Sequence, residues 1–269
     1  MKNIRPSTFQ LLAIGALMSM ASLGQAATTW TPGTAAACNL AVGATYQACS
    51  GSAVTSNGVT ATSSAYSTTG TNQTLAGATL YDHDFNSMGV VSAAEMPGAE
   101  PQHAMDNVSS TDLISIKFSS ALVALTAVTT TYVSGDSDMS LLAYTGTNGQ
   151  YSLVGKTTAN LITDGWKLVA TINGGTAGAT YAGLNAGGIT SSWWIISAYN
   201  SGYGGTGAGV DAGDDYMKLL SVAGDIKTTT SKVPEPGSLM LMGAAFCAAV
   251  GARRRAMGKA NKANTTLAA

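Results

Sequence analysis

The segment Leu113-Ile114-Ser115-Ile116-Lys117-Phe118 alternates between apolar and polar side chains. Successive side chains of a β-strand point to opposite faces. Ile114, Ile116 and Phe118 therefore share one face, and Ser115 and Lys117 share the other. The alternation predicts a half-buried strand whose apolar face rests on a core.

Other stretches have the β-branched and aromatic composition of strands. They are Leu122 to Val133, Trp193 to Tyr199 and Tyr216 to Val222. Between Thr28 and Lys232 the sequence shows no sustained apolar stripe of helical period. With 32 glycines in the chain, this pattern predicts an all-β fold, a single β-sandwich or jelly-roll-like domain over residues 28–232.

Asparagine–glycine pairs mark the turns expected between short strands. Three such places are Asn57-Gly58 between Ala53–Thr55 and Val59–Ala61, Asn148-Gly149 between Leu141–Tyr144 and Tyr151–Val154, and Asn173-Gly174-Gly175 after Trp166–Ile172.

The N-terminus has the three parts of a secretory signal peptide. Lys2 and Arg5 give a basic start, Leu11 to Met20 form an apolar stretch, and Gly24-Gln25-Ala26 offers a small-residue cleavage site. Residues 1–26 are therefore predicted to be a signal peptide, exported by the general secretion machinery and removed by signal peptidase.

The exported body is acidic. Residues 28–232 contain six lysines, no arginine and thirteen acidic residues, which gives a net charge of −7. Nucleic-acid binding depends on basic contacts to phosphates. The composition therefore argues against a nucleic-acid partner and leaves cations and neutral glycans as candidates.

Two cysteines, Cys38 and Cys49, lie in the body. In an oxidising compartment this pair is a disulfide candidate. Two free thiols are the alternative. A zinc site would need further ligands, and no histidine precedes His83.

The C-terminal segment has a distinctive order. Val233-Pro234-Glu235-Pro236 precedes an apolar run of 14 residues from Leu239 to Ala252, which Arg253, Arg254 and Arg255 follow. As a helix this run would span roughly 21 Å, less than the ~30 Å core of a bilayer. Arginines stop translocation and stay in the cytoplasm. A C-terminal membrane helix is therefore predicted, with the body outside and residues 256–269 as a cytoplasmic tail.

This order resembles the PEP-CTERM sorting signal of bacterial exosortase substrates, over residues 233–255. The resemblance implies a transient anchor in the inner membrane and cleavage by exosortase near Pro234-Glu235-Pro236. It also implies delivery to the cell surface or to the exopolysaccharide matrix. Residues 256–269 make a longer tail than this family usually carries.

The body, over about residues 78–230, resembles a family of exosortase-dependent surface proteins of Gram-negative bacteria. That resemblance implies a surface location and no assigned enzymatic activity. The segments that carry it are Gln102–Asn107, Asp136–Asp138, Ala143–Gly146, Asp164–Trp166, Ser192–Asn200 and Asp215–Leu220.

Closely spaced acids beside glycines suggest a cation site. Such oxygen ligands suit the flexible coordination of Ca²⁺, although no EF-hand pattern is present and aspartate near glycine is also ordinary turn chemistry. The candidate ligands are Asp136, Asp138, Asp211, Asp214 and Asp215. No other cofactor is expected.

Adjacent tryptophans suggest a sugar platform. Trp193 and Trp194 must face opposite sides of a strand, so one is expected in the core and the other covered or exposed. With Tyr199 and Tyr203 nearby, an exposed indole could stack on a sugar ring. The alternative is that loops cover both indoles.

The two histidines lie beside acids, in Asp82-His83-Asp84 and in His103-x-x-Asp106. Such pairs occur in metal sites and acid–base pairs. The chain has no Gly-x-Ser-x-Gly nucleophile elbow. The leading hypothesis is therefore a non-enzymatic surface or matrix protein associated with exopolysaccharide. The alternatives are a glycan-binding module and, less favoured, a secreted hydrolase or metalloenzyme.

Overall fold

The computed structural model describes residues 27–38, 46–69, 73–83, 86–93, 95, 103–119, 122–147, 152–211, 213–227 and 246. The chain divides into two compact units, Met1–Lys227 and Thr228–Ala269. The first unit contains every strand described below.

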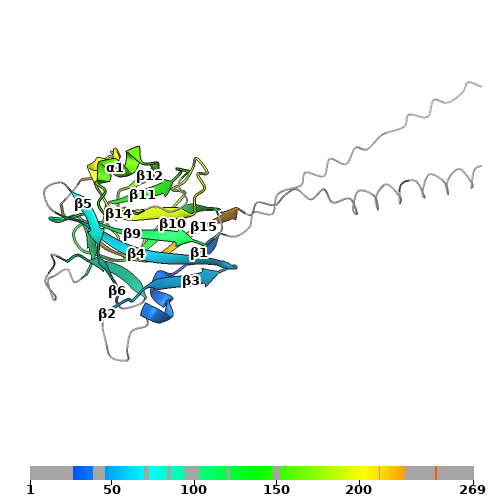
Figure 1. Cartoon of the computed structure of the whole chain (residues 1–269), viewed down its shortest axis with the longest axis horizontal. Coiled ribbons are helices and arrows are strands. Elements are labelled where there is room, and N and C mark those ends of the chain that lie inside the picture. The colour runs from blue at the N-terminus through cyan, green and yellow to red at the C-terminus, as the bar shows by residue number, and fades with distance from the viewer. Residues whose placement is uncertain are drawn as a thin grey trace, which may run out of the picture. The chain divides into compact units, whose positions relative to one another are not determined.

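An eight-stranded antiparallel sheet forms one layer of the first unit (Figure 1). Its order is β13 (Thr180–Ala182), β10 (Leu122–Val133), β15 (Tyr216–Lys227), β7 (Ser87–Val91), β6 (Thr79–His83) and β2 (Tyr46–Ala48). Two short strands also pair with β15, namely β1 (Thr28–Trp30) and β8 (Met105–Asp106).

A seven-stranded antiparallel sheet forms the other layer. Its order is β12 (Trp166–Ile172), β11 (Met139–Tyr144), β14 (Trp193–Ala198), β9 (Asp112–Phe118), β4 (Val59–Thr69) and β3 (Ser52–Ser56), with β5 (Thr74–Gly77) on β4. The short helices are η1 (Pro32–Thr34), η2 (Ala36–Cys38), α1 (Thr158–Thr163) and η3 (Ser201–Tyr203).

The two sheets pack face to face over a large apolar core, which confirms the predicted β-sandwich. Ile114, Ile116 and Phe118 of β9 point into this core, as their alternation predicts. The Trp30 ring packs against Phe118 with ring centroids 4.7 Å apart. Its indole N–H donates to the Val59 carbonyl at 2.9 Å, so the buried ring keeps its polar atom satisfied.

A second apolar cluster covers the outer face of the seven-stranded sheet. It joins Leu113 and Ile195 of the sheet to Leu75 on β5, Leu161 on α1 and Tyr203 on η3. The prediction that β9 is only half-buried is therefore wrong. Ser115 is buried as well, and only Lys117 of this strand is exposed.

The helix α1 helps to form that cover. It begins at a capping box, in which the Thr157 hydroxyl accepts from the Asn160 amide at 3.1 Å and the Asn160 side chain accepts from the Thr157 amide at 3.3 Å. The helix buries Leu161 in the second cluster. An ion pair of 2.6 Å between Lys156 and Asp164 spans its two ends.

The Asn57-Gly58 turn joins β3 and β4 as predicted. Ser56 pairs with Val59 across it, and both turn residues have the positive φ, 48° and 75°, that this two-residue turn requires. The strand β12 also ends at Ile172, directly before Asn173-Gly174-Gly175.

The strand predicted over Tyr151–Val154 is wrong in its described part, residues 152–154, which form no strand. Instead, Leu153 is buried in the second cluster. The chain next to it bonds to β5, since the Gly155 amide donates to the Leu75 carbonyl and the Leu75 amide donates to the Lys156 carbonyl, both at 2.8 Å. Asn148-Gly149 lies outside the described residues.

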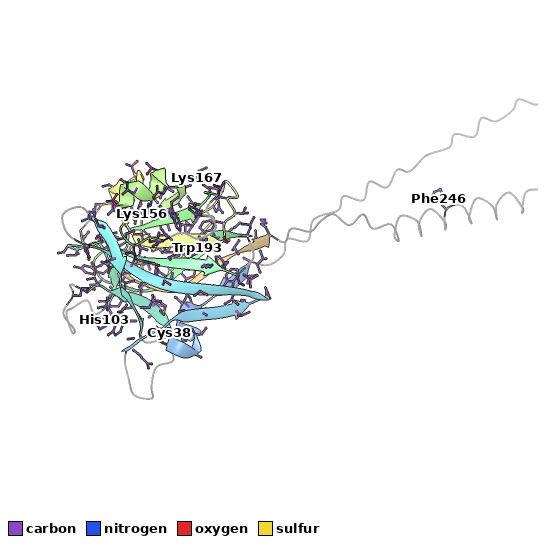
Figure 2. The ribbon with its side chains drawn as sticks, viewed as in Figure 1. Cys38, His103, Lys156, Lys167, Trp193 and Phe246 are labelled. Atoms are coloured by element: carbon purple, nitrogen blue, oxygen red, sulfur yellow. A yellow bond between two sulfur atoms is a disulfide. The ribbon has the colours of Figure 1, made fainter. Side chains whose placement is uncertain are left out.

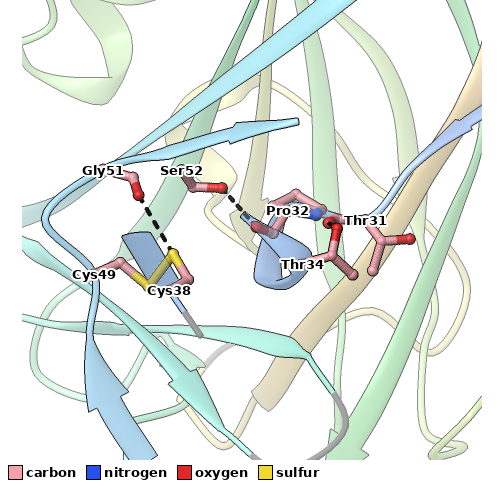
Figure 3. Close-up of a disulfide and its surroundings, with 7 residues drawn as sticks. All are labelled: Thr31, Pro32, Thr34, Cys38, Cys49, Gly51 and Ser52. Atoms are coloured by element: carbon pink, nitrogen blue, oxygen red, sulfur yellow. Dashed lines mark hydrogen bonds between the residues drawn. A yellow bond between two sulfur atoms is a disulfide. The ribbon is translucent and has the colours of Figure 1, made fainter. Parts of the chain in front are cut away.

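Cys38 and Cys49 form a disulfide, as predicted (Figure 3). Cys38 ends η2 and is fully buried, and Cys49 follows β2 with its amide bonded to the Leu80 carbonyl at 2.8 Å. The Ser52 hydroxyl donates to the Pro32 carbonyl at 2.8 Å. These contacts join the N-terminal helical turns to both sheets.

Replacing both cysteines by serine is expected to lower the free energy of unfolding by about 2–3 kcal/mol, because the cross-link restricts the unfolded chain. Urea denaturation of the oxidised protein and the double variant measures this difference. A reductant should weaken the natural chain and leave the variant unchanged. Equal urea midpoints for the oxidised protein and the variant would contradict the expectation.

The predicted signal peptide, residues 1–26, lies outside the described residues. So do the Val233–Pro236 motif, most of the apolar run Leu239–Ala252, the arginines Arg253 to Arg255 and the tail 256–269. Among the residues that are described, no helix combines the length and apolar character needed to cross a membrane.

Candidate functional site

Three of the five predicted cation ligands converge at one end of the sandwich. Asp136 and Asp138 lie between β10 and β11, and Asp215 directly precedes β15. One carboxylate oxygen from each lies within 4.8 Å of the others. Asp138 and Asp215 are fully buried. We call these three residues the Asp138 cluster.

Backbone amides already bond the buried carboxylates of the Asp138 cluster. Asp138 accepts from the Gly174 amide at 3.0 Å and from the Asp211 amide at 2.8 Å. Asp215 accepts from the Asp138 amide and from the Asn107 side chain. The hydrogen bonds of the cluster therefore join four chain segments to one another.

Asn107 is a partner that the sequence analysis did not identify. Its amide nitrogen also donates to the Tyr199 carbonyl at 3.0 Å, and its oxygen accepts from the Gly213 and Asp215 amides at 3.0 and 3.2 Å. An Asn that bonds backbone groups far away in sequence leaves no local pattern. In the sequence, Asn107 stood out only as the last residue of Gln102–Asn107, one of the segments that resemble the surface-protein family.

The two other predicted ligands lie beside the cluster and are exposed. A hydrogen bond with Asp214 raises the pKa of Asp211, and the repulsion of nearby carboxylates adds to the rise. The structure thus gathers all five acids in one neighbourhood, with three in direct proximity. Calcium binding here stays a prediction.

A second group of acids lies at the same end of the sandwich. It comprises Glu95, Asp106 at the end of β8, and Asp112 at the start of β9, with one oxygen of each within 4.8 Å of the others. We call it the Asp112 cluster. Asp106 accepts from the Val108 amide at 3.0 Å, and Glu95 accepts from the Ser92 amide.

Burial raises the pKa of Asp112 well above its usual value, and the charges of Asp106 and Glu95 raise it further. The Ser67 hydroxyl and the Asp106 amide lie near enough to counter part of this rise. Yet no described residue donates a hydrogen bond of ordinary geometry to either Asp112 oxygen. The sequence did carry one signal, because Asp112 has the same alternation as Ile114 and therefore points to the core.

Without divalent cations, the protein is expected to lose stability as the pH rises from about 4 to about 7. Burial raises the pKa of Asp106 and of Asp215 from 3.8 to about 7. Within this window the folded state binds more protons than the unfolded state, so the free energy of unfolding falls with rising pH.

Urea midpoints measured in a chelator at several pH values test this dependence. Asp106→Asn and Asp215→Asn should each reduce the slope, because each removes one titrating group. A free energy of unfolding that increases steadily across the window would contradict the expectation.

The four predicted aromatic residues differ in exposure. Trp194 is fully buried between the sheets, where its indole N–H donates to the Val123 and Ser191 carbonyls at 3.2 and 3.1 Å. The Tyr199 hydroxyl donates to the Gly205 carbonyl at 2.9 Å. Tyr203 is buried beside the Ser197 hydroxyl, and burial raises its pKa to about 12. Because these three rings are buried, they cannot form the exposed platform that the sequence suggested.

Trp193, labelled in Figure 2, is partly exposed and packs against the second cluster, on the face of β14 opposite to Trp194. It borders a hollow of about 220 Å³. The Lys117 ammonium lies 4.9 Å from the centre of its ring. The hollow is otherwise lined by Leu122, Tyr144, Thr145, Gly146, Thr147, Thr190, Ser191 and Ser192. Hydroxyl groups around a partly exposed indole are typical of a sugar-binding surface.

Of the two histidines, His103 is buried and its ring stacks on Tyr81, with centroids 4.3 Å apart. His83 ends β6 and pairs with Tyr46 and Ser87 through its backbone. Its side chain and Asp84 lie outside the described part of the chain. Within that part, both acid clusters consist of carboxylates alone.

One protein family matches the chain, the PEP-CTERM protein-sorting motif, over residues 232–255. The match includes the Val233–Pro236 segment and the arginines Arg253 to Arg255, on which the sequence analysis placed the sorting signal. No curated protein and no solved structure matches the chain. The resemblance of the body to a surface-protein family therefore stays a prediction.

Proposed function

We propose that the chain is exported and processed by exosortase for the cell surface or the extracellular space, because residues 232–255 match the PEP-CTERM protein-sorting motif, and that it is a non-enzymatic component of the extracellular matrix. In this proposal its body associates with exopolysaccharide. The observation that carries the proposal is the match of residues 232–255 to the sorting motif, which begins five residues after β15 ends at Lys227.

The processing steps belong to the proposal. The signal peptide, residues 1–26, directs the chain to the general secretion machinery and is removed by signal peptidase. The apolar run Leu239–Ala252 and the arginines Arg253 to Arg255 then hold the chain in the inner membrane of a Gram-negative cell. Exosortase cleaves near Pro234-Glu235-Pro236, and the body leaves for the surface or the matrix.

The construction of the body supports a durable structural role. A disulfide joins its N-terminal turns to β2, and apolar clusters lie on both faces of the seven-stranded sheet. The buried acids of the Asp138 cluster connect loops through backbone amides. These features stabilise the folded body.

The test uses protein processed by its own host and the exopolysaccharide of that host. The processed protein should sediment with the polysaccharide, and an acidic exported protein of similar size should not. Sedimentation with and without a chelator shows whether a divalent cation takes part in the contact. Absence of the protein from the polysaccharide under both conditions would contradict matrix association.

A second candidate function, a glycan-binding module, is favoured by the partly exposed Trp193 beside its hydroxyl-lined hollow. Trp193→Ala should abolish retention on the polysaccharide, whereas Trp193→Phe keeps an aromatic face and should retain part of it. Lys117→Gln is the matched control for charge, because Lys117 lies over the same ring. Undiminished retention of a folded Trp193→Ala variant would exclude this site.

A further inference from the structure

The Asp112 cluster brings together carboxylates from three separate parts of the chain. Glu95 follows β7, Asp106 ends β8 on the eight-stranded sheet, and Asp112 begins β9 on the seven-stranded sheet. The cluster therefore bridges the two sheets at the end of the core. The charged neighbours that shift the pKa of Asp106 and Asp112 are carboxylates of this same cluster.

Asp112 distinguishes this cluster from the Asp138 cluster. Its side chain is fully buried, and no described residue donates a hydrogen bond of ordinary geometry to either of its oxygens, although the Ser67 hydroxyl and the Asp106 amide lie nearby. A buried polar group without a partner is costly and rare in folded proteins. Asp138, by contrast, accepts two backbone amides. The oxygens without an ordinary hydrogen bond thus belong to the Asp112 cluster, whose residues were not among the cation ligands predicted from the sequence.

The spacing of the oxygens suits a hard divalent cation. Ca²⁺ binds oxygen ligands at about 2.3–2.6 Å, so oxygens on opposite sides of the ion lie roughly 4.8 Å apart. The three carboxylate oxygens lie within 4.8 Å of one another, close enough to share one ion. Ca²⁺ is favoured over Mg²⁺ because it accepts irregular coordination, whereas Mg²⁺ demands near-ideal octahedral geometry and gives up its water reluctantly.

An ion can approach from the surface. Glu95 is partly exposed, Asp106 is 7% exposed and Asp112 is 0% exposed. The cluster thus leads from solvent to the end of the core. Water can complete the coordination on the Glu95 side, because Ca²⁺ takes six to eight oxygen ligands and three carboxylates leave positions open.

We propose that Glu95, Asp106 and Asp112 form a Ca²⁺ site that joins the two sheets at the end of the sandwich core. The ion supplies the partner that the Asp112 oxygens lack and offsets the repulsion among three carboxylates. It also ties the segment that contains Glu95 to β8 and β9. The site is separate from the predicted ligands around Asp138.

The test measures Ca²⁺ binding and thermal unfolding of the full-length chain after chelator treatment. At a Ca²⁺ concentration about 100 times Kd, a single site should raise Tm by about 5–10 °C. Calorimetric titration with Ca²⁺ alone should show one site that is present in the natural chain and missing in Asp112→Asn. Asp112→Asn should abolish both effects without unfolding the protein, since a neutral amide of similar shape removes a buried carboxyl group that lacks a hydrogen-bond partner.

Two further variants keep the test decisive. Glu95 lies at the partly exposed edge of the cluster, so Glu95→Gln should weaken Ca²⁺ binding at least tenfold while the fold is retained. Asp225→Asn, a partly exposed acid on β15 outside both clusters, is the matched control and should bind as the natural chain does. No binding by the natural chain, or binding lost in Asp225→Asn and kept in Asp112→Asn, would overturn the proposal.

Discussion

Replacing Gly89 by alanine is expected to lower the free energy of unfolding by roughly 3 kcal/mol or more. Gly89 is buried in β7, and a Cβ atom there would lie 1.5 Å from the His103 carbonyl oxygen. The neighbouring side chain explains this contact, since Tyr81 pairs with Gly89 and its ring stacks on His103. The chain at His103 therefore lies directly on the sheet, and only a glycine leaves room for it.

Gly77 provides the matched control, because a Cβ atom at that position in β5 would meet nothing within 4 Å. Gly77→Ala should therefore leave the free energy of unfolding within a few tenths of a kcal/mol of the natural value, or raise it slightly. Equal midpoints for Gly89→Ala and Gly77→Ala would show that the His103 segment does not pack on β7.

Replacing Trp194 by alanine is expected to cost about 3–5 kcal/mol, as for other buried tryptophans. The ring is fully buried in the inter-sheet core. Its indole N–H donates to the carbonyls of Val123 on β10 and Ser191 before β14, so it joins the two layers directly. Removing the ring opens a cavity and leaves two carbonyls without this donor.

Trp194→Phe separates the contribution of the ring volume from that of the indole hydrogen bonds. It keeps most of the ring volume and loses the N–H donor, so its cost should lie well below that of alanine. Trp193→Ala, on the opposite face of the same strand, should cost less than Trp194→Ala because its ring is partly exposed. A larger loss at Trp193 than at Trp194 would show that the two faces of β14 have been assigned the wrong way round.

The sequence predicted the inner face of the sandwich correctly, and the outer face of the seven-stranded sheet wrongly. The alternation of Ile114, Ile116 and Phe118 is local, so it can be read from a short segment. The cover over Leu113 comes from Leu75, Leu161 and other residues far away in the chain. No local period reports such long-range burial.

The two acid clusters show the same limit of prediction from local sequence. Asp136 and Asp138 are near in sequence, and their meeting with Asp215 follows from the proximity of strand ends that an antiparallel sheet imposes. Glu95, Asp106 and Asp112 lie within 17 residues of sequence, but Asp106 belongs to the eight-stranded sheet and Asp112 to the seven-stranded sheet. Their convergence depends on how the sheets pack, which the sequence pattern does not specify.

The sequence correctly predicted that Trp193 and Trp194 face opposite ways, but Tyr199 and Tyr203 are not available to a ligand. Adjacent residues on a strand must face opposite ways, and Trp193 and Trp194 do. Tyr199 and Tyr203 were predicted to belong to the platform because they lie near the two tryptophans in the sequence. Their hydroxyls instead bond the Gly205 carbonyl and the Ser197 side chain, and both rings are buried.

The central claim is that the PEP-CTERM motif sorts this β-sandwich to the outside of the cell. The most direct measurement is cell fractionation of a host that makes exosortase and expresses a chain with Pro234, Glu235 and Pro236 changed to alanine. The account predicts full-length protein in the inner membrane, as for the natural chain in a host without exosortase. Normal processing and release of the altered chain would contradict it.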